Sequence, residues 1–183
     1  MTLRSVPIRN VSAWTGRQKA GRLLWAIVYR LFFRMTFHNW YAVRAAILRG
    51  FGAKIGRNVR IRRTVHIEIP WNLELADDVS VGDEAILYAL GPIRIQQRSV
   101  VSQYAHLCAG THDHTHKDFP LLRVPVIVGQ DCWIAADAFI GPGVSIGDRS
   151  VVGARATVVK DVPPDQVVGG NPARFLKARV LQD

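Results

Sequence analysis

The stretch VGQDCWIAADAFIGPGVSIGDRSVVGARATVVKDV, residues 128–162, repeats in units of six residues. Each unit opens on a β-branched aliphatic residue: Val128, Ile134, Ile140, Ile146, Val152 and Val158. Four residues later comes a small or medium-sized residue: Cys132, Ala138, Val144, Ser150, Ala156 and Val162. A strict short period of this kind predicts a solenoid, in which each repeat buries its apolar side chains against its neighbours.

A period of six residues predicts a left-handed parallel β-helix, because each hexapeptide can form one flat face of a triangular coil. The aliphatic residue points into the prism, and the second inward residue has to be small because the corner is narrow. We expect the glycines and asparagines near the corners to permit the tight bends. The left-handed turn makes this fold an exception to the usual right-handed crossover.

Earlier parts of the chain carry the same period with shifts of register. The aliphatic runs are Ile55, Ile61, Ile67; Leu75, Val81, Leu87, Ile93; and Ile95, Val101, Leu107. The offset between the last two runs predicts a two-residue irregularity near Pro92, and the segment 69–72 is expected to bulge outward. The β-helix domain is therefore predicted to cover residues 53–170.

A basic, aromatic leader of residues 1–52 precedes the repeats. Residues 1–67 contain fourteen Lys or Arg and no acidic residue, whereas the rest of the chain has ten basic and fourteen acidic residues. Apolar spacing predicts helices over residues 17–35 and 40–49, with Asn39 as N-cap and Gly50 past the end. Such a block can bind nucleic acid, anionic lipid or a phosphorylated substrate.

Several features predict a cytoplasmic location. The most apolar run of the leader, residues 23–29, is too short to cross a membrane and does not fit a signal peptide. The two cysteines, Cys108 and Cys132, form no CxxC pair and are expected to be buried, reduced thiols. At the other end, Asn171 and Pro172 predict the start of a short closing helix over residues 171–183.

The repeat has one long interruption, the loop of residues 108–125. Three of the six histidines lie in it: His112, His114 and His116. A loop that leaves a rigid solenoid is a usual place for function. Histidine titrates near neutral pH, so the loop is expected to supply a general base.

Specific motifs accompany the repeat. They are Gly110-Thr111-His112-Asp113, Cys132-Trp133-Ile134, and a tail with Gly153-Ala154, Lys160-Asp161 and Gly170-Asn171-Pro172-Ala173-Arg174. With these motifs, residues 50–180 resemble the hexapeptide-repeat acetyltransferases. The sequence Tyr88-Ala89-Leu90-Gly91 and the basic leader suggest the branch that acts in colanic-acid-type exopolysaccharide biosynthesis.

The resemblance implies a homotrimer that transfers an acetyl group from acetyl-CoA to a sugar or lipid-linked saccharide, without a metal ion. His112 would be the general base. Cofactor-binding residues would be Trp133, Ala136, Ala154, Lys160, Arg174 and Lys177. Acceptor-binding residues would be Tyr88, Leu90 and Asp113. Leu90 stands where the galactoside enzymes carry Asn, and Val159 stands where Thr is common, so neither contact transfers directly.

Two alternatives stay open. The three loop histidines could hold Zn²⁺ as in the γ-carbonic anhydrases, which share the β-helix. A non-enzymatic protein could instead bind nucleic acid through its basic arm, but no base-reading motif accompanies that arm. The leader could also contact the inner face of a membrane, because a basic face beside an aromatic-rich apolar face is typical of interfacial helices.

Overall fold

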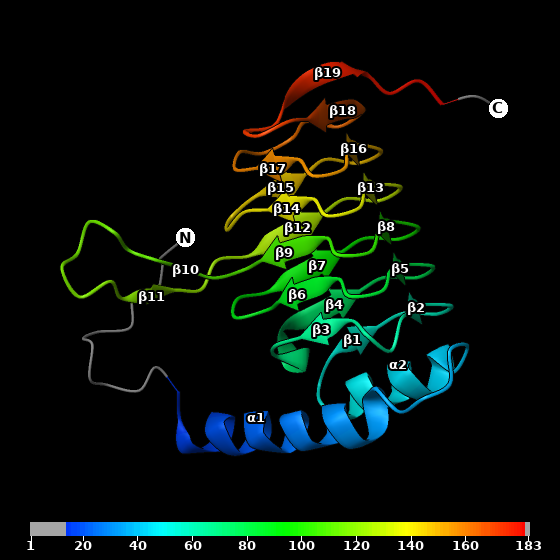
Figure 1. Ribbon diagram of the computed structural model, residues 1–183, viewed down its shortest axis with the longest axis vertical. Helices are drawn as coiled ribbons and strands as arrows, with labels where there is room; N and C mark the ends of the chain where they lie inside the picture. The colour runs from blue at the N-terminus through cyan, green and yellow to red at the C-terminus, as the bar shows by residue number, and fades with distance from the viewer. Residues whose placement is uncertain (1–13, 182–183) are drawn as a thin grey trace.

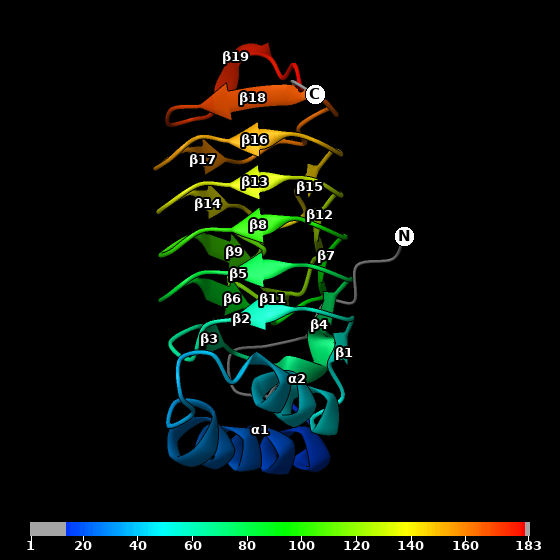
Figure 2. The same ribbon diagram turned by 90° about the vertical axis from the view of Figure 1, so that its right-hand side faces the viewer.

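The computed structural model describes residues 14–181 as a three-faced prism with helices at one end (Figures 1 and 2). Expectations for residues 1–13 of the leader and for residues 182–183 lie outside the described residues. Successive strands stack in parallel along the prism, one per face in each turn of the chain. The predicted left-handed parallel β-helix is therefore confirmed.

Each face of the prism is one parallel sheet. The first face contains β1 (Lys54–Ile55), β4 (Leu73–Leu75), β7 (Ile93–Ile95), β12 (Val126–Val128) and β15 (Ser145–Ile146). The second contains β2 (Arg60–Ile61), β5 (Ser80–Val81), β8 (Val100–Val101), β13 (Trp133–Ile134), β16 (Val151–Val152) and β18 (Gln166–Gly169), with β19 (Arg174–Ala178) at its edge. The third contains β3 (His66–Ile67), β6 (Ile86–Tyr88), β9 (His106–Cys108), β14 (Phe139–Ile140) and β17 (Thr157–Val158).

The aliphatic residues of the repeat fill the prism as predicted. All six opening residues of the quoted stretch and all six residues of the second set are buried. The coil between Ile127 and its partner Ser145 spans 18 residues. The pairs Lys54–Glu74 and Glu74–Arg94 show that the first two coils span 20 residues each. The extra residues in the second coil confirm the irregularity near Pro92.

The segment 69–72 does not bulge outward as predicted. Pro70–Asn72 form a short 3₁₀ helix, and Ile69 and Pro70 are buried. Trp71 lies against Gly21 and Gly52 of the leader. The apolar side chains therefore turn towards the leader, which covers this end of the prism.

Glycine has two roles at the corners. Gly143 has a left-handed φ of 80° and permits a bend, as predicted. Left-handed φ angles of 54° to 60° occur at non-glycine corner residues such as Asn58, Asp131 and Arg149. Gly129 and Gly147 instead allow close approach between coils. A Cβ atom on Gly129 would lie 2.7 Å from the Asp148 nitrogen, and one on Gly147 would lie 2.5 Å from the Pro164 nitrogen.

The leader folds into α1 (Gly16–Val28), a π-helical turn η1 (Tyr29–Phe33) and α2 (Tyr41–Gly50). Both predicted helices are thus confirmed. The predicted cap at Asn39 is wrong, since α2 is capped at Trp40 without a side-chain hydrogen bond and Gly50 is its last residue. Within residues 14–181, no helix is long and apolar enough to span a bilayer.

Three side chains of the leader close the open edge of the first coil, one on each face. Arg49 donates to the Ile55 carbonyl of the first face at 2.8 Å. The buried Arg44 donates to Ile61 O of the second face at 2.6 Å, and the Trp25 indole donates to Ile67 O of the third at 2.8 Å. These donors replace the hydrogen bonds that a preceding coil would supply.

The predicted C-terminal helix is wrong. Residues Arg174–Ala178 form β19, which runs antiparallel to β18 after a cis peptide bond between Asn171 and Pro172. The last coil presents a row of unpaired backbone groups, and a strand can satisfy them whereas a helix cannot. The local signal for a helix start is therefore overridden by pairing at the edge of the sheet.

Candidate active site

The loop that carries the three histidines leaves the prism between β9 and β12, at the corner of the third and first faces (Figure 1). Its base is a small antiparallel hairpin of β10 (Thr111–His112) and β11 (Leu121–Leu122). Gly110, at the foot of the loop, lies directly on the Leu90 side chain. The loop is thus held by strand pairing and packing, and it projects His112 away from the prism.

His112 is exposed, and one hydrogen bond defines its orientation. Its Nδ1 lies 2.5 Å from the Phe119 carbonyl oxygen across the loop. A carbonyl oxygen can only accept, so Nδ1 carries the proton. In the neutral ring, Nε2 then keeps its lone pair, and it has no protein partner among residues 14–181. This is the tautomer that a general base requires.

Asp113 folds the tip of the loop. Its Oδ1 accepts from the Thr115 amide at 2.9 Å and from the Thr115 hydroxyl at 2.6 Å. These bonds hold the pKa of Asp113 below its ordinary value, with a smaller contribution from His114 and His116. The carboxylate is therefore engaged within the loop, and its contact with an acceptor stays a prediction.

The other two loop histidines have different surroundings from His112. His114 is exposed, and His116 Nδ1 lies 3.2 Å from the Asp118 amide, which donates to it. Nowhere in the described part of the chain do three or more His, Cys, Asp or Glu residues form a group that could hold a metal ion.

Three of the predicted cofactor residues lie together on another side of the prism. Trp133 stands on the second face, is 48% exposed, and donates from Nε1 to the Ser102 hydroxyl at 2.9 Å. Ala136 and Ala154 follow at the corner between the second and third faces, one coil apart, where the Arg155 amide donates to Ala136 O at 2.9 Å. Trp133, Ala136 and Ala154 are referred to below as the tryptophan strip.

Two of the predicted basic residues share a cavity near the C-terminal end. Lys160 and Arg174 both line a hollow of about 390 Å³ between β17, β18 and β19. Val159 is exposed beside Lys160 and also lines it. Lys177 is exposed on β19. The structure therefore brings Lys160 and Arg174 together, while Lys177 lies further along the same strand.

The predicted acceptor residues differ in accessibility. Tyr88 is 36% exposed, its ring meets the His106 ring edge-on, and partial burial raises its pKa. Leu90 is only 6% exposed beneath Gly110. Contact between Leu90 and the acceptor stays a prediction, and within one chain the Leu90 side chain packs beneath the foot of the loop.

One chain does not bring the histidine loop to the tryptophan strip. The loop leaves from the corner of the third and first faces, whereas Trp133 lies on the second face, and the two views place them on opposite sides (Figures 1 and 2). A complete site that used both features would need a second copy of the chain.

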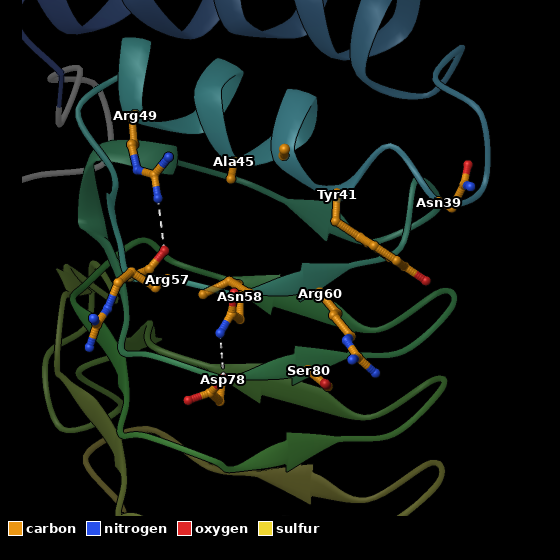
Figure 3. Close-up of a pocket in the computed structure, with 12 residues that line it drawn as sticks. Asn39, Tyr41, Ala45, Arg49, Arg57, Asn58, Arg60, Asp78 and Ser80 are labelled. Atoms are coloured by element: carbon orange, nitrogen blue, oxygen red, sulfur yellow. Dashed lines mark hydrogen bonds between the residues drawn. The ribbon is translucent and has the colours of Figure 1, made fainter.

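A cavity of about 690 Å³ between α2 and the second face was not predicted from the sequence (Figure 3). Its lining includes Asn39 and Tyr41 of the leader and Arg60 and Ser80 of the first two coils. These residues belong to separate parts of the fold: the start of α2 and the residues before it, β2 and β5. No regular spacing along the chain therefore connects them. The only available signal was the excess of basic residues in this part of the chain.

Residues 125–160 match the family model for bacterial transferase hexapeptide repeats. The chain is also 47% identical over 157 residues to WcaF of Escherichia coli strain K12, which is named for colanic acid biosynthesis as an acetyltransferase. That alignment covers 86% of each chain. The chain belongs to the hexapeptide-repeat acetyltransferases. The predicted resemblance to this family, and to its exopolysaccharide branch, is confirmed.

Other members of the family show wider similarity. Galactoside O-acetyltransferase of Escherichia coli strain K12 is 31% identical over 124 residues, which cover 67% of this chain and 55% of that enzyme. A hexapeptide-repeat acetyltransferase of Vibrio cholerae, solved with acetyl-CoA, has a TM-score of 0.83 at 25% identity and covers 95% of this chain and 94% of that one. Membership of this acetyltransferase family favours neither the zinc enzyme nor the non-enzymatic protein.

Proposed function

We propose that this acetyltransferase transfers the acetyl group of acetyl-CoA to a hydroxyl group of a saccharide, with His112 as general base. The observation that carries the proposal is the tautomer of His112, whose Nδ1 donates to Phe119 O and whose Nε2 faces outward unpaired among the described residues. The acetyl-CoA bound to the Vibrio cholerae relative and the name of the galactoside enzyme support the choice of donor and acceptor.

The reaction follows from the chemistry of the exposed Nε2. It takes the proton of the sugar hydroxyl while that oxygen attacks the thioester carbonyl carbon. The C–S bond then breaks, and the imidazolium returns its proton to the departing thiolate, which leaves as the thiol of coenzyme A. The hydrogen bond to Phe119 O keeps the ring oriented and stabilises the positive charge during the step.

The coenzyme would lie along the strip formed by Trp133, Ala136 and Ala154. The indole would pack against the pantetheine arm, and the two alanines would leave room for it. Lys160, Arg174 and Lys177 would meet the phosphates of the nucleotide, since amines and guanidinium groups are the usual partners of phosphate. Tyr88 and Asp113 remain candidate contacts of the acceptor.

A homotrimer would complete this site. The His112 loop and the Trp133 strip lie on opposite sides of one prism, so a loop from one copy could reach the strip of the next (Figure 1). A closed ring of three such contacts uses the same pair of surfaces at each interface.

Incubation of the protein with acetyl-CoA and a panel of free, nucleotide-linked and lipid-linked sugars tests the function. We expect acceptor-dependent release of the coenzyme A thiol and a product heavier by one acetyl group, measured by mass spectrometry. Thiol release without any acetylated sugar, across the whole panel, would argue against saccharide O-acetylation.

The surface of the leader supports a second proposal, contact with a lipid bilayer. Nine large apolar side chains, between 43% and 73% exposed, lie on α1, on η1, on the segment before α2 and on the first turn of α2. They are Leu23, Leu24, Ile27, Leu31, Phe32, Met35, Phe37, Trp40 and Val43. Exposed Arg17, Lys19 and Arg30 accompany them. An apolar surface with basic neighbours and no acidic residue complements an anionic bilayer.

Flotation with vesicles containing phosphatidylglycerol checks this contact. We expect the protein to float with anionic vesicles at low salt, and the double substitution Leu31→Ser, Phe32→Ser to reduce the bound fraction about tenfold or more, because each apolar side chain contributes to burial in the interface. Val180→Ser, at the opposite end of the molecule, should have no effect. Retention of the wild-type protein in the soluble fraction would contradict lipid binding. Self-association of the wild-type protein that the double variant loses would show that the apolar surface binds a second copy of the chain instead.

A further inference from the structure

The cavity between α2 and the second face has the form of a binding site. Its roof is α2 with the residues before it, and its wall is formed by β2, β5 and the corners that precede them (Figure 3). At about 690 Å³ it is in the range of volumes that hold a small ligand. It lies outside the histidine loop and the tryptophan strip. None of the residues assigned above to proton transfer or coenzyme binding lines it.

Some polar side chains of this cavity form hydrogen bonds or ion pairs with other protein groups, and others do not. Arg57 pairs with Asp77, at 2.7 Å and 2.9 Å, and Arg49 donates to the carbonyls of Ile55 and Gly56. In contrast, the side chains of Asn39, Arg60 and Ser80 make no hydrogen bond or ion pair within residues 14–181. An arginine, an amide and a hydroxyl therefore line one hollow without a side-chain hydrogen bond to any other described residue.

Charge favours an anion at one end of the cavity. Asp78 is the acidic residue of the lining, and its Oδ1 accepts from Asn58 Nδ2 at 3.1 Å. Arg60 and Ser80 lie side by side on paired strands at the other end, below Tyr41 (Figure 3). Among the described residues, the Arg60 guanidinium has no partner and is separated from Asp78, the one carboxylate of the lining. Guanidinium groups bind phosphate and carboxylate with two hydrogen bonds.

Arg60 also lies in line with the proposed coenzyme strip. The strand register places Arg60 beside Ser80, Ser80 beside Val100, and Val100 beside Trp133, so all four stand in one outward column. Neighbouring strands are about 4.8 Å apart, which puts Arg60 about 14 Å below Trp133. A saccharide that carries an anionic group could bridge this distance, with its hydroxyl at the strip and its charge at Arg60.

We propose that this cavity is the acceptor end of the active site and that Arg60 binds an anionic group of the saccharide, either a phosphate or a carboxylate. The inference rests on the proposed saccharide acetylation and narrows its substrate class to acidic or phosphorylated saccharides. Ser80, on the paired strand, would supply a further hydrogen bond to the same group. Arg60 is a binding residue in this proposal and takes no part in proton transfer.

Kinetics with matched acceptors test the role of Arg60. The probes are glucose, glucose 1-phosphate, UDP-glucose and glucuronate. For Arg60→Gln we expect KM for the charged acceptors to rise about tenfold or more, with KM for acetyl-CoA unchanged, because one charge-assisted contact is lost. Arg60→Lys should recover part of the loss. Lys54→Gln removes an exposed charge on the first face and should change neither constant.

A direct binding measurement keeps the two proposals distinguishable. Calorimetry should show that the three charged probes bind the wild-type protein more tightly than glucose does, and that Arg60→Gln abolishes the difference. A preference for glucose 1-phosphate and UDP-glucose identifies a phosphate site, and a preference for glucuronate identifies a carboxylate site. Equal binding of glucose and the charged probes, or unchanged affinity in Arg60→Gln, overturns the inference even if sugars are acetylated. Charge-dependent binding without any acetyl transfer overturns the proposed function and leaves the anion site standing.

Discussion

Replacement of His112 by alanine is expected to lower kcat by about 10²- to 10⁴-fold, the range that a positioned general base contributes. The physical reason is the loss of Nε2, the nitrogen that the hydrogen bond from Nδ1 to Phe119 O leaves unprotonated. The exposed side chain carries no part of the core, so the fold should be retained. The measurement is the rate of thiol release at saturating acetyl-CoA, with the acceptor that the panel identifies.

His114→Ala and His116→Ala are the matched controls for this variant. Both side chains are exposed in the same loop, and neither has the carbonyl partner that orients His112. We expect both variants to keep turnover within about threefold of the wild type. The affinity of His112→Ala for coenzyme A should also be unchanged, because the proposed coenzyme strip lies on the second face. Turnover that survives in His112→Ala would remove His112 from the mechanism.

Replacement of Arg44 by methionine is expected to lower the free energy of unfolding by about 3 kcal/mol or more. Arg44 is fully buried. It donates to Ile61 O and the Thr36 hydroxyl, each at 2.6 Å, and to Phe37 O and His38 O, each at 2.8 Å. Methionine has a similar volume but no donor, so it leaves these acceptors without a partner at the junction of the leader and the first coil.

Urea denaturation followed by circular dichroism measures this loss as a lower midpoint with an unchanged slope. Arg63→Met is the control, since Arg63 is exposed in the same region and should shift stability by less than about 0.5 kcal/mol. An equal midpoint for Arg44→Met and the wild type would show that the leader contributes little to the stability of the prism.

The repeat was predictable because its cause is local and recurs. The inward position has to be a buried aliphatic residue in every coil. The same requirement therefore recurs at Val128, Ile134 and Ile140. The loop around His112 was predictable for the complementary reason, as an interruption of a strict period. The same applied to the leader helices, whose apolar spacing is a property of each helix alone.

The errors arose where distant parts of the chain meet. Asn171 and Pro172 carry a local signal for a helix, but the unpaired edge of β18 selects a strand for the residues that follow. The segment 69–72 was expected to bulge outward, yet Trp71 packs against Gly21 and Gly52 of the leader. Gly129 and Gly147 were expected to permit bends, whereas the close approach of the next coil explains them.

The candidate site shows the same division. Motifs indicated His112, Trp133 and Lys160 individually, but they could not show that the loop and the strip lie on opposite sides of one prism. Nor could they indicate Arg60, whose lack of a partner among the described residues becomes visible only when α2 is placed above the first two coils.

The two closed ends of the prism have a consequence for how long the structure can grow. A stack of identical coils has no inherent length, because each edge strand offers the same hydrogen bonds to the next strand that arrives. Here Trp25, Arg44 and Arg49 fill one terminus, and β19 reverses direction at the other. Both termini are thereby made unlike the interior coils, which disfavours the joining of separate molecules end to end into a filament.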